Sequence, residues 1–352
     1  MAESSVVLSV GVVSAVGLTA GEMAASVRSA TMRFTESEIR DRSLEPVTVA
    51  EVPEDGLSEL IGPLGAMNLT SRQRRMLQIA AAPLRECLLS LPANTPAPGL
   101  VLALPETETA RPLDRPGFLE LLVQQSGLAF DARASDGSHS GRAGGLLALR
   151  RAAELVQSRT HGFMVAGGVD SYLDLYVLDG LDAEGRLKSS ANLDGFIPGE
   201  GAAFLLIASR EAAAAAGLKA IASISAVADE FETGHLRSEE PYLGEGLARA
   251  VTKLIQTNAV KQPFCEVFSS MNGESYWAKE WGVTLVRNHN AFAEDHRIHH
   301  PADCCGDTGA ASGPLMCALA AMGIRDGYYR SPCLVYASSD GGQRAALAVD
   351  TA

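Results

Sequence analysis

The chain has 352 residues, of which 47% are hydrophobic and 20% are charged, as in a globular protein with two domains or one large duplicated domain. Its formal net charge of −13 argues against binding to nucleic acid or to an anionic membrane, since both favour dense Lys and Arg. Six cysteines in a chain of this size make no disulfide framework, so we expect free thiols. No apolar run is long enough to span a membrane, and the N-terminus lacks the basic start of a signal peptide. We therefore expect a cytoplasmic protein.

The first part of the chain is predicted to alternate strands and helices. The apolar run over residues 5–14 predicts a strand buried on both faces, and Thr19 with Glu22 predicts a capped helix over 20–29. Residues 33–70 carry breakers and scattered charge and are expected at the surface. The further elements predicted here are a helix from Thr70 to Leu89, a strand over 100–104, helices over 117–127 and 141–156, and strands over 162–168 and 203–208.

The second part repeats this alternation and ends in a buried helix and two strands. Its predicted elements are strands over 220–227, 264–269 and 283–286, a helix over 243–257, and strands over 332–337 and 343–349. Before the last two strands, the apolar helix that follows Gly313 has no polar face, so it must be buried. Its first turn contains only small residues, which lets another backbone come close. These patterns alone predict a mixed α/β fold.

Several stretches together carry a family resemblance. They are the Val-rich opening run, Val165-Ala166-Gly167-Gly168, Asp194-Gly195-Phe196-Ile197-Pro198-Gly199-Glu200-Gly201-Ala202-Ala203, and Cys305-Gly306-Asp307-Thr308-Gly309-Ala310-Ala311-Ser312-Gly313 with a helix ending at Arg325-Asp326-Gly327. In this combination the chain resembles the β-ketoacyl synthases of the thiolase superfamily. The resemblance implies a duplicated α/β thiolase fold with five layers, αβαβα, and halves at residues 1–212 and 213–352. It also implies a homodimer or heterodimer built across the first-half sheet.

The resemblance also locates the family's catalytic positions, and all four are changed. A decarboxylating ketosynthase needs a thiolate at a helix N-terminus and two imidazoles that stabilise the enolate and the oxyanion. Here the nucleophile position falls on Arg142, the two histidine positions on Asn272 and Asp307, and the lysine position on Ala302. A guanidinium cannot attack a thioester, so we expect no covalent acyl loading at this helix.

The residues expected around the former pocket are also replaced or charged. They are Glu274 beside the first histidine position, Asp340, Gly341 and Gly342 in the turn where the family has its gating phenylalanine, and Phe196. Arg142 at a helix N-terminus opposes the helix dipole by roughly 0.3–1 kcal/mol. We therefore predict an ion pair between Arg142 and Asp307, with Glu274 as a second candidate partner.

Three other groups of residues have competing interpretations. Cys305 or Cys304 is a candidate relocated nucleophile beside His299 and His300, although inert buried thiols are favoured. The cluster of His289, His296, His299, His300, Cys304, Cys305 and Asp307 is interpreted as a polar strand and turn, because the adjacent cysteines lack the paired spacing of zinc ligands. Arg72, Arg74 and Arg75 fit a solvated helix face, with a docking patch for an acidic partner as the alternative.

The sequence favours a catalytically inactive, ketosynthase-like scaffold that acts through protein–protein contacts and needs no metal or cofactor. One version is a non-catalytic subunit beside an active ketosynthase, and so close to an acyl carrier protein. The other is an adaptor or chaperone in a secretion or assembly system. The alternative is a divergent acyltransferase or 3-oxoacyl synthase that uses Cys305, or Asp307 as a base.

Overall fold

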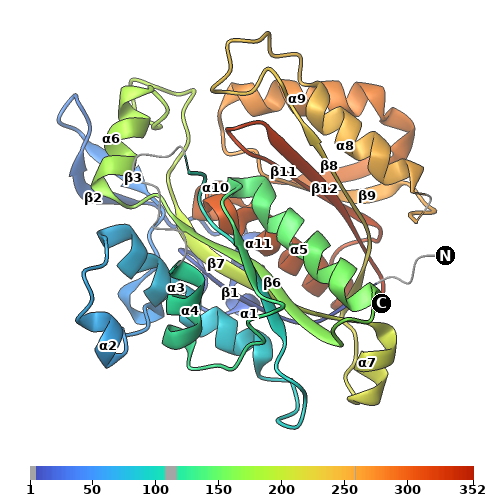
Figure 1. The fold of residues 1–352 in the computed structure, drawn as a ribbon. Helices are drawn as coiled ribbons and strands as arrows, with labels where there is room; N and C mark the ends of the chain where they lie inside the picture. Colours follow the sequence, from blue (N-terminus) through green and yellow to red (C-terminus); the bar gives the residue numbers. More distant parts are fainter. Residues whose placement is uncertain (1–4, 108–116, 258) are drawn as a thin grey trace.

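A ten-stranded sheet runs through the computed structural model, which describes residues 5–107, 117–257 and 259–352 (Figure 1). The strand order is β10-β9-β11-β12-β8-β1-β7-β6-β4-β5. The first five strands in the chain to join it are β1 (Ser5–Ser14), β4 (Gly99–Ala103), β5 (Asp136–Ser138), β6 (Phe163–Ser171) and β7 (Glu200–Ala208). The other five are β8 (Ala222–Phe231), β9 (Phe264–Ser269), β10 (Phe292–His299), β11 (Cys333–Ser338) and β12 (Gln343–Asp350).

The two halves of the sheet have the same topology. In the first half, β7 pairs antiparallel with both β1 and β6, and β4 pairs parallel with β6 and β5. In the second half, β12 pairs antiparallel with both β8 and β11, and β9 pairs parallel with β11 and β10. A short antiparallel contact between β1 and β8 joins the halves, with Ser5 opposite Ile224. The repeated order is the duplication that the sequence predicted.

Helices form three layers around the halves of the sheet (Figure 1). In the central layer, α5 (Gly141–Gln157) contacts β4 and β6 on one side and β11 and β12 on the other, and α11 (Ser312–Arg325) contacts β7 and β11. On the outer face of the first half, α3 (Ser71–Leu88) contacts β1, β6 and β7 and carries α4 (Phe118–Ser126). On the second half, α8 (Glu245–Gln256) contacts β8 and β12 and carries α9 (Ser275–Arg287). The predicted αβαβα layering is confirmed.

Small residues let the central layer pack closely, as the sequence predicted. A Cβ added to Gly145 of α5 would lie 2.2 Å from Cδ of Pro314 in α11. A Cβ added to Gly168 of β6 would lie 2.2 Å from the carbonyl oxygen of Ala310. Neither position has room for a larger residue, so these contacts fix the start of α11 against α5 and β6.

The remaining elements lie around this frame. They are α1 (Ala20–Arg28), β2 (Thr35–Arg40), β3 (Pro46–Val49), α2 (Gly62–Gly65), α6 (Leu175–Ala183), α7 (Arg210–Ala215) and α10 (Ala302–Cys305). The predicted boundary after residue 212 falls inside α7, and the division into two structural units stays a prediction. Within the part of the chain that the structure describes, no helix has both the length and the apolar character needed to cross a lipid bilayer.

One prediction of secondary structure needs correction, and several elements were not predicted. The predicted strand over 283–286 is wrong, because these residues form the last turns of α9. Trp277, Trp281 and Leu285 recur at helical spacing and form the side of α9 that faces the protein interior. The strand of this region is β10, which follows α9. Its sequence, FAEDHRIH, is charged because it is an edge strand, and it therefore lacks an apolar run. The β2–β3 hairpin and α6 also form where no element was predicted.

Candidate functional site

The site lies at the N-terminus of α5, in the centre of the molecule. Gly141 begins this helix with a φ of 59°, and the hydroxyl of Ser339 accepts a hydrogen bond from the N–H of Ala143 at 2.9 Å. The same hydroxyl donates to the carbonyl oxygen of Ser140 at 2.6 Å. The turn after β11 therefore caps the start of α5, and Arg142, which is 3% exposed, lies in the first turn.

Arg142 binds two buried carboxylates. Its Nε donates to Oδ2 of Asp307 at 2.7 Å, and Nη2 lies 2.6 Å from the same oxygen. Its Nη1 donates to Oδ1 of Asp340 at 2.7 Å. The predicted Arg142–Asp307 pair is therefore present. Burial opposes the charge of Arg142, but the two carboxylates outweigh this effect and raise the pKa of the guanidinium well above its ordinary value.

Arg186 is a second buried cation that sequence reasoning missed. Its Nε and Nη2 donate to the two oxygens of Glu274 at 2.8 and 2.9 Å, and its Nη1 donates to Oδ2 of Asp340 at 2.6 Å. Although burial raises the pKa of Asp340, the charges of Arg142 and Arg186 lower it below its ordinary value. A signal was available, because the predicted site held Arg142 beside three carboxylates, and buried charges need compensation.

Asn272, in the connection between β9 and α9, and Trp277, in the first turn of α9, complete the network. The amide of Asn272 donates to Oδ2 of Asp307 at 2.8 Å and to Oε2 of Glu274 at 3.1 Å. The indole N–H of Trp277 donates to Oε2 of Glu274 at 3.0 Å. Asn272, at the position predicted for a catalytic histidine, is thus a neutral donor that binds two carboxylates.

The 194–203 stretch frames both Asp307 and Arg186. The backbone N–H of Asp307 donates to the carbonyl oxygen of Ile197, and the N–H of Gly199 donates to that of Asp307, both at 2.9 Å. Phe196 is fully buried, packs edge-on against Tyr172, and lies under the guanidinium of Arg186 at 5.3 Å. Phe196 therefore packs against the charge network and helps to position Arg186.

Glu106 is a further carboxylate that sequence reasoning did not identify. Its Oε1 accepts a hydrogen bond from the N–H of Gly341 at 3.0 Å, beside Asp340 and Gly342. Gly342 has a φ of 102°, which a residue with a side chain rarely adopts. Burial, together with the negative charge of Asp340, raises the pKa of Glu106 to about 7. The turn that contains Asp340, Gly341 and Gly342 is thus bound by a carboxylate whose pKa is raised toward neutral pH.

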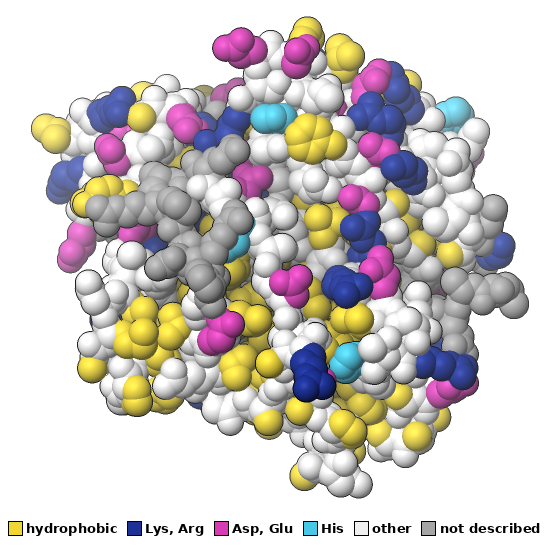
Figure 2. All heavy atoms as spheres, viewed as in Figure 1, with side chains coloured by type: hydrophobic (Ala, Val, Ile, Leu, Met, Phe, Trp, Pro, Cys, Tyr) yellow, Lys and Arg dark blue, Asp and Glu magenta, His cyan; other side chains and the backbone are white. Residues whose placement is uncertain are grey.

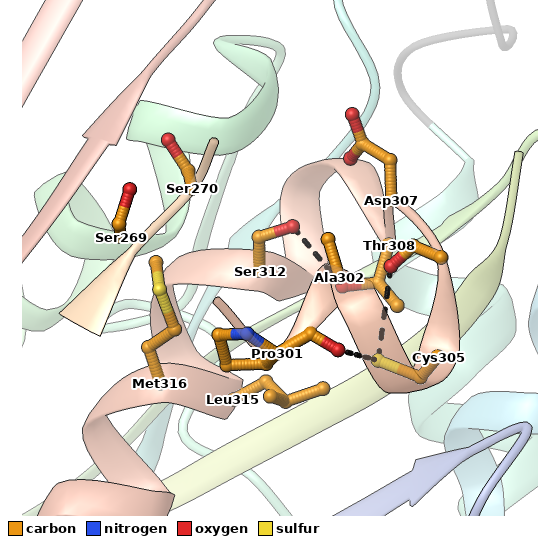
Figure 3. A pocket seen from close by; sticks show the side chains of 11 residues that line it. Ser269, Ser270, Pro301, Ala302, Cys305, Asp307, Thr308, Ser312, Leu315 and Met316 are labelled. Atoms are coloured by element: carbon orange, nitrogen blue, oxygen red, sulfur yellow. Dashed lines mark hydrogen bonds between the residues drawn. The ribbon is translucent and has the colours of Figure 1, made fainter. Parts of the chain in front are cut away.

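The cavity beside Asp307 is very small (Figure 3). Its volume is about 10 Å³, and Ala302, Cys305, Ser312 and Met316 are among its lining residues. A space of this size holds about one water molecule. No acyl chain fits into this cavity.

The two candidate thiols lie outside the charge network. The Cys305 thiol is buried and donates to the carbonyl oxygen of Pro301 at 3.2 Å, as Figure 3 shows. Burial raises the pKa of both Cys305 and Cys304, which disfavours the reactive thiolate. Both residues lie at the C-terminal end of the short helix α10, where a helix dipole does not favour a thiolate either.

The histidine cluster is dispersed along β10 and its flanks. The Nε2 atom of His299 lies 2.8 Å from a carboxylate oxygen of buried Glu266, whereas His296 contacts the carbonyl oxygen of Ala293. Among the residues placed by the structure, no three His, Cys, Asp or Glu side chains are grouped in a way that could hold a metal ion.

The predicted solvated arginine face of α3 is wrong for two of its three residues. Arg72 is 3% exposed and donates to Oδ1 of Asp170 at 2.8 Å. Arg75 donates to Oε1 of Glu200 at 2.6 Å. Buried carboxylates at the end of β6 and the start of β7 draw these side chains inward, so Arg72 is buried and Arg75 is half-buried.

Comparison with known proteins agrees with this fold. A family model described as Beta-ketoacyl synthase, N-terminal domain, matches residues 137–213. No curated protein matches the chain. A structure titled "The ishigamide ketosynthase/chain length factor" matches with a TM-score of 0.78 and 16% identity over 100% of both chains.

Two further structures extend this likeness. A structure of a type II PKS acyl-carrier protein in complex with its ketosynthase matches with a TM-score of 0.77 and 14% identity over 100% of both chains. The ketosynthase from module 6 of the bacillaene synthase of Bacillus subtilis 168 matches with a TM-score of 0.80 and 13% identity, covering 99% of this chain and 72% of that one. At such low identity, the likeness shows the shared fold.

Proposed function

We propose that this chain, which has the ketosynthase fold of the thiolase superfamily, is a catalytically inactive scaffold that acts through protein–protein contacts. The observation that carries the proposal is Arg142 at the nucleophile position, bound to Asp307 and Asp340. A buried guanidinium with two carboxylates neither attacks a thioester nor leaves room for one. The two former histidine positions, Asn272 and Asp307, serve the same network and supply no imidazole.

The partner that we favour is an active ketosynthase, with this chain as its non-catalytic subunit. Support comes from the match to a ketosynthase/chain length factor structure over the full length of both chains. The first half of the sheet ends in the short edge strand β5, whose outer side no described strand pairs with. Since the resemblance implies a dimer across this half of the sheet, β5 is the expected centre of the contact.

The surface near α2 and α4 suits such a contact. Hydrophobic side chains gather over these helices in Figure 2, at the lower left. Ile61 and Met67, which flank α2, are 36% and 43% exposed, and the Ile61 N–H is bonded to the side chain of Gln125 in α4. Exposed apolar surface of this kind is typical of a protein interface. All six cysteines are unpaired, which fits a reducing cytoplasm.

An adaptor or chaperone in a secretion or assembly system is the second version of this proposal. Support comes from the cavity of only about 10 Å³ beside Asp307 and from the predicted loss of the gate, since a subunit that shapes a neighbouring acyl site has more reason to keep an open pocket and a gate. The enzyme alternative is less well supported, because the Cys305 thiol is buried with a raised pKa and Asp307 is engaged by Arg142 and Asn272.

Acyl loading tests the inactive character of the chain. The purified protein is incubated with acyl-thioesters, and its intact mass is measured. We expect no covalent acyl adduct in the parent protein or in Cys305→Ala. An adduct that forms on the parent and disappears in Cys305→Ala would instead establish the acyltransferase alternative.

Affinity purification from native cells separates the two scaffold versions. Recovery of a ketosynthase with an intact Cys-His-His set, or of an acyl carrier protein, supports the subunit. Recovery of unrelated proteins without either of these supports the adaptor.

A further inference from the structure

A cavity lies at the opposite end of the first-half strands from the charge network, beside α7 (Figure 1). The network lies beyond the C-terminal end of β4, where the N–H of Gly141 in α5 donates to the carbonyl oxygen of Leu104. The cavity is lined by Phe163, the first residue of β6, which runs parallel to β4. Its volume is about 690 Å³, and ligand-binding clefts commonly measure about 300–1,000 Å³. A small molecule therefore fits here without any change at the charge network.

Much of the lining of this cavity is apolar. The walls come from the loop between α3 and β4, the segment after α4, the connection between α5 and β6, and α7. Their apolar residues have small or rigid side chains, namely Pro92, Pro96, Ala97, Phe163, Ala212, Ala215 and Ala216. Because apolar surface is stabilised by removal from water, these walls favour an occupant with a hydrocarbon body.

Among the described residues that line the cavity, only Asp131 has a permanent charge. Its backbone N–H donates to the carbonyl oxygen of Pro98 at 2.9 Å, and its Oδ1 accepts a hydrogen bond from the N–H of Arg133 at 3.0 Å. The bond from Arg133, followed by the bond from His161, lowers the pKa of Asp131. The Arg133 side chain is exposed and does not line the cavity. Asp131, whose side chain is 38% exposed, is thus an ionised carboxylate that a ligand can reach.

His161 binds the other oxygen of this carboxylate. Its Nε2 lies 3.3 Å from Oδ2 of Asp131, whereas its Nδ1 is buried and has no hydrogen-bond partner among the described residues. A neutral ring with its proton on Nε2 fits both observations, since a second proton would leave a buried N–H without an acceptor. Because a neutral His161 does not cancel the charge of Asp131, the lining of the cavity has a net negative charge.

We propose that this cavity is a binding site for an organic ammonium ion, whose charged group pairs with Asp131 while its hydrocarbon body lies against the proline and alanine walls. A carboxylate that accepts two hydrogen bonds still has lone pairs for an ammonium N–H. Asp131 would repel an anion, and a neutral apolar molecule would take water from the carboxylate without replacing its hydrogen bonds. This binding site goes beyond the scaffold function and does not depend on it.

Calorimetric titration of the full chain with n-hexylammonium tests the site, with 1-hexanol and hexanoate as probes of the same length. We expect hexylammonium to bind about threefold to tenfold more tightly than 1-hexanol, as for one charge pair at a partly exposed position. Hexanoate should bind more weakly than both. Equal affinities for the three probes, or no binding of hexylammonium, would overturn the proposal.

Two substitutions locate the bound probe, and thermal unfolding checks that each variant is folded. Asp131→Asn removes the charge but can still accept the bond from Arg133, so the preference for hexylammonium over 1-hexanol should disappear. Ala215→Phe places a large side chain at an exposed position of the α7 wall and should weaken binding of both probes. Asp55→Asn, the control at an exposed carboxylate outside the cavity, should change neither affinity. Binding that survives both Asp131→Asn and Ala215→Phe, or that falls equally in Asp55→Asn, would contradict this site.

Discussion

Arg142 and Arg186 share Asp340 and thereby join two ion pairs into one buried network. Arg142 adds Asp307 to it, and Arg186 adds Glu274. Two guanidinium groups thus face three carboxylates, and Asn272 and Trp277 supply neutral donors to the remaining carboxylate oxygens. Because every member depends on the others, removal of one cation leaves charges that burial makes costly.

Replacement of Arg142 by methionine should strongly destabilise the fold. Arg142→Met keeps a long side chain but leaves Asp307 and Asp340 without their shared cation. The expected loss is about 3–5 kcal/mol of unfolding free energy, as for other broken buried ion pairs. Urea unfolding measures it. The control is Arg151→Met in the same helix, whose side chain is 56% exposed and where a change within about 0.5 kcal/mol is expected. Equal effects of the two changes would contradict a tightly coupled network.

Glu106 should make the stability of the protein depend on pH near neutrality. Its pKa is raised in the folded protein from 4.5 to about 7. The folded state therefore binds this proton more tightly, and ionisation of Glu106 lowers the unfolding free energy as the pH rises between these values. The difference in unfolding free energy between Glu106→Gln and the parent should therefore increase across this pH range, by up to about 1.4 kcal/mol per pH unit. Above this range, the difference should stay constant. Urea unfolding at several pH values checks this, and a pH-independent difference would refute it.

Prediction of the site from the sequence succeeded where motifs gave a frame. Counting from Gly167 and Gly168 located Arg142, and the small-residue stretch located Asp307, so their opposite charges then predicted the ion pair between them. Arg186 and Glu106 lie outside any motif, and only the three-dimensional path of the chain brings them to Asp340 and Gly341. Contacts between residues so far apart in the sequence leave no local pattern from which they could be predicted.

At the scale of elements, the contact between α5 and α11 depends on glycine. Gly145→Ala would place a methyl group 2.2 Å from Cδ of Pro314 and 2.9 Å from the carbonyl oxygen of Ala310. Since both neighbours are rigid, we expect a loss of about 1–3 kcal/mol or more from overpacking. Gly282→Ala in α9 is the matched control, because nothing lies within 4 Å of its added Cβ. There the better helix propensity of alanine should add up to about 1 kcal/mol. Thermal unfolding compares the two, and a neutral Gly145→Ala would show that the helices can separate.

Elements were predictable from the sequence where burial imposes a pattern. The fully buried strand β7 and the all-apolar helix α11 carry uninterrupted apolar runs, and both were found. The edge strand β10 has mostly polar residues, and in α9 the run Val283-Thr284-Leu285-Val286 suits a strand as well as a helix. Only the packing of Trp281 and Leu285 of α9 against the second half of the sheet decides between these forms.

For the whole molecule, the central helical layer makes the two halves depend on each other. The same core contains Leu146 and Leu149 of α5, from the first half, and Leu315, Val335 and Leu347 from the second half. Each half therefore covers the inner face of the other half's sheet. Separation would expose this apolar face to water, at a cost that rises with its area.

We expect the chain to unfold in one cooperative step despite its duplicated topology. Differential scanning calorimetry should show a single transition, with calorimetric and van't Hoff enthalpies that agree. Residues 1–212 and 213–352, expressed separately, should each lack a sharp unfolding transition, because each has lost half of the shared core. Mixed together, they should recover the transition if the missing surface is the only defect. A fragment of residues 213–352 that melts cooperatively alone would instead show that this half holds an independent core, with α11 sufficient to cover its sheet.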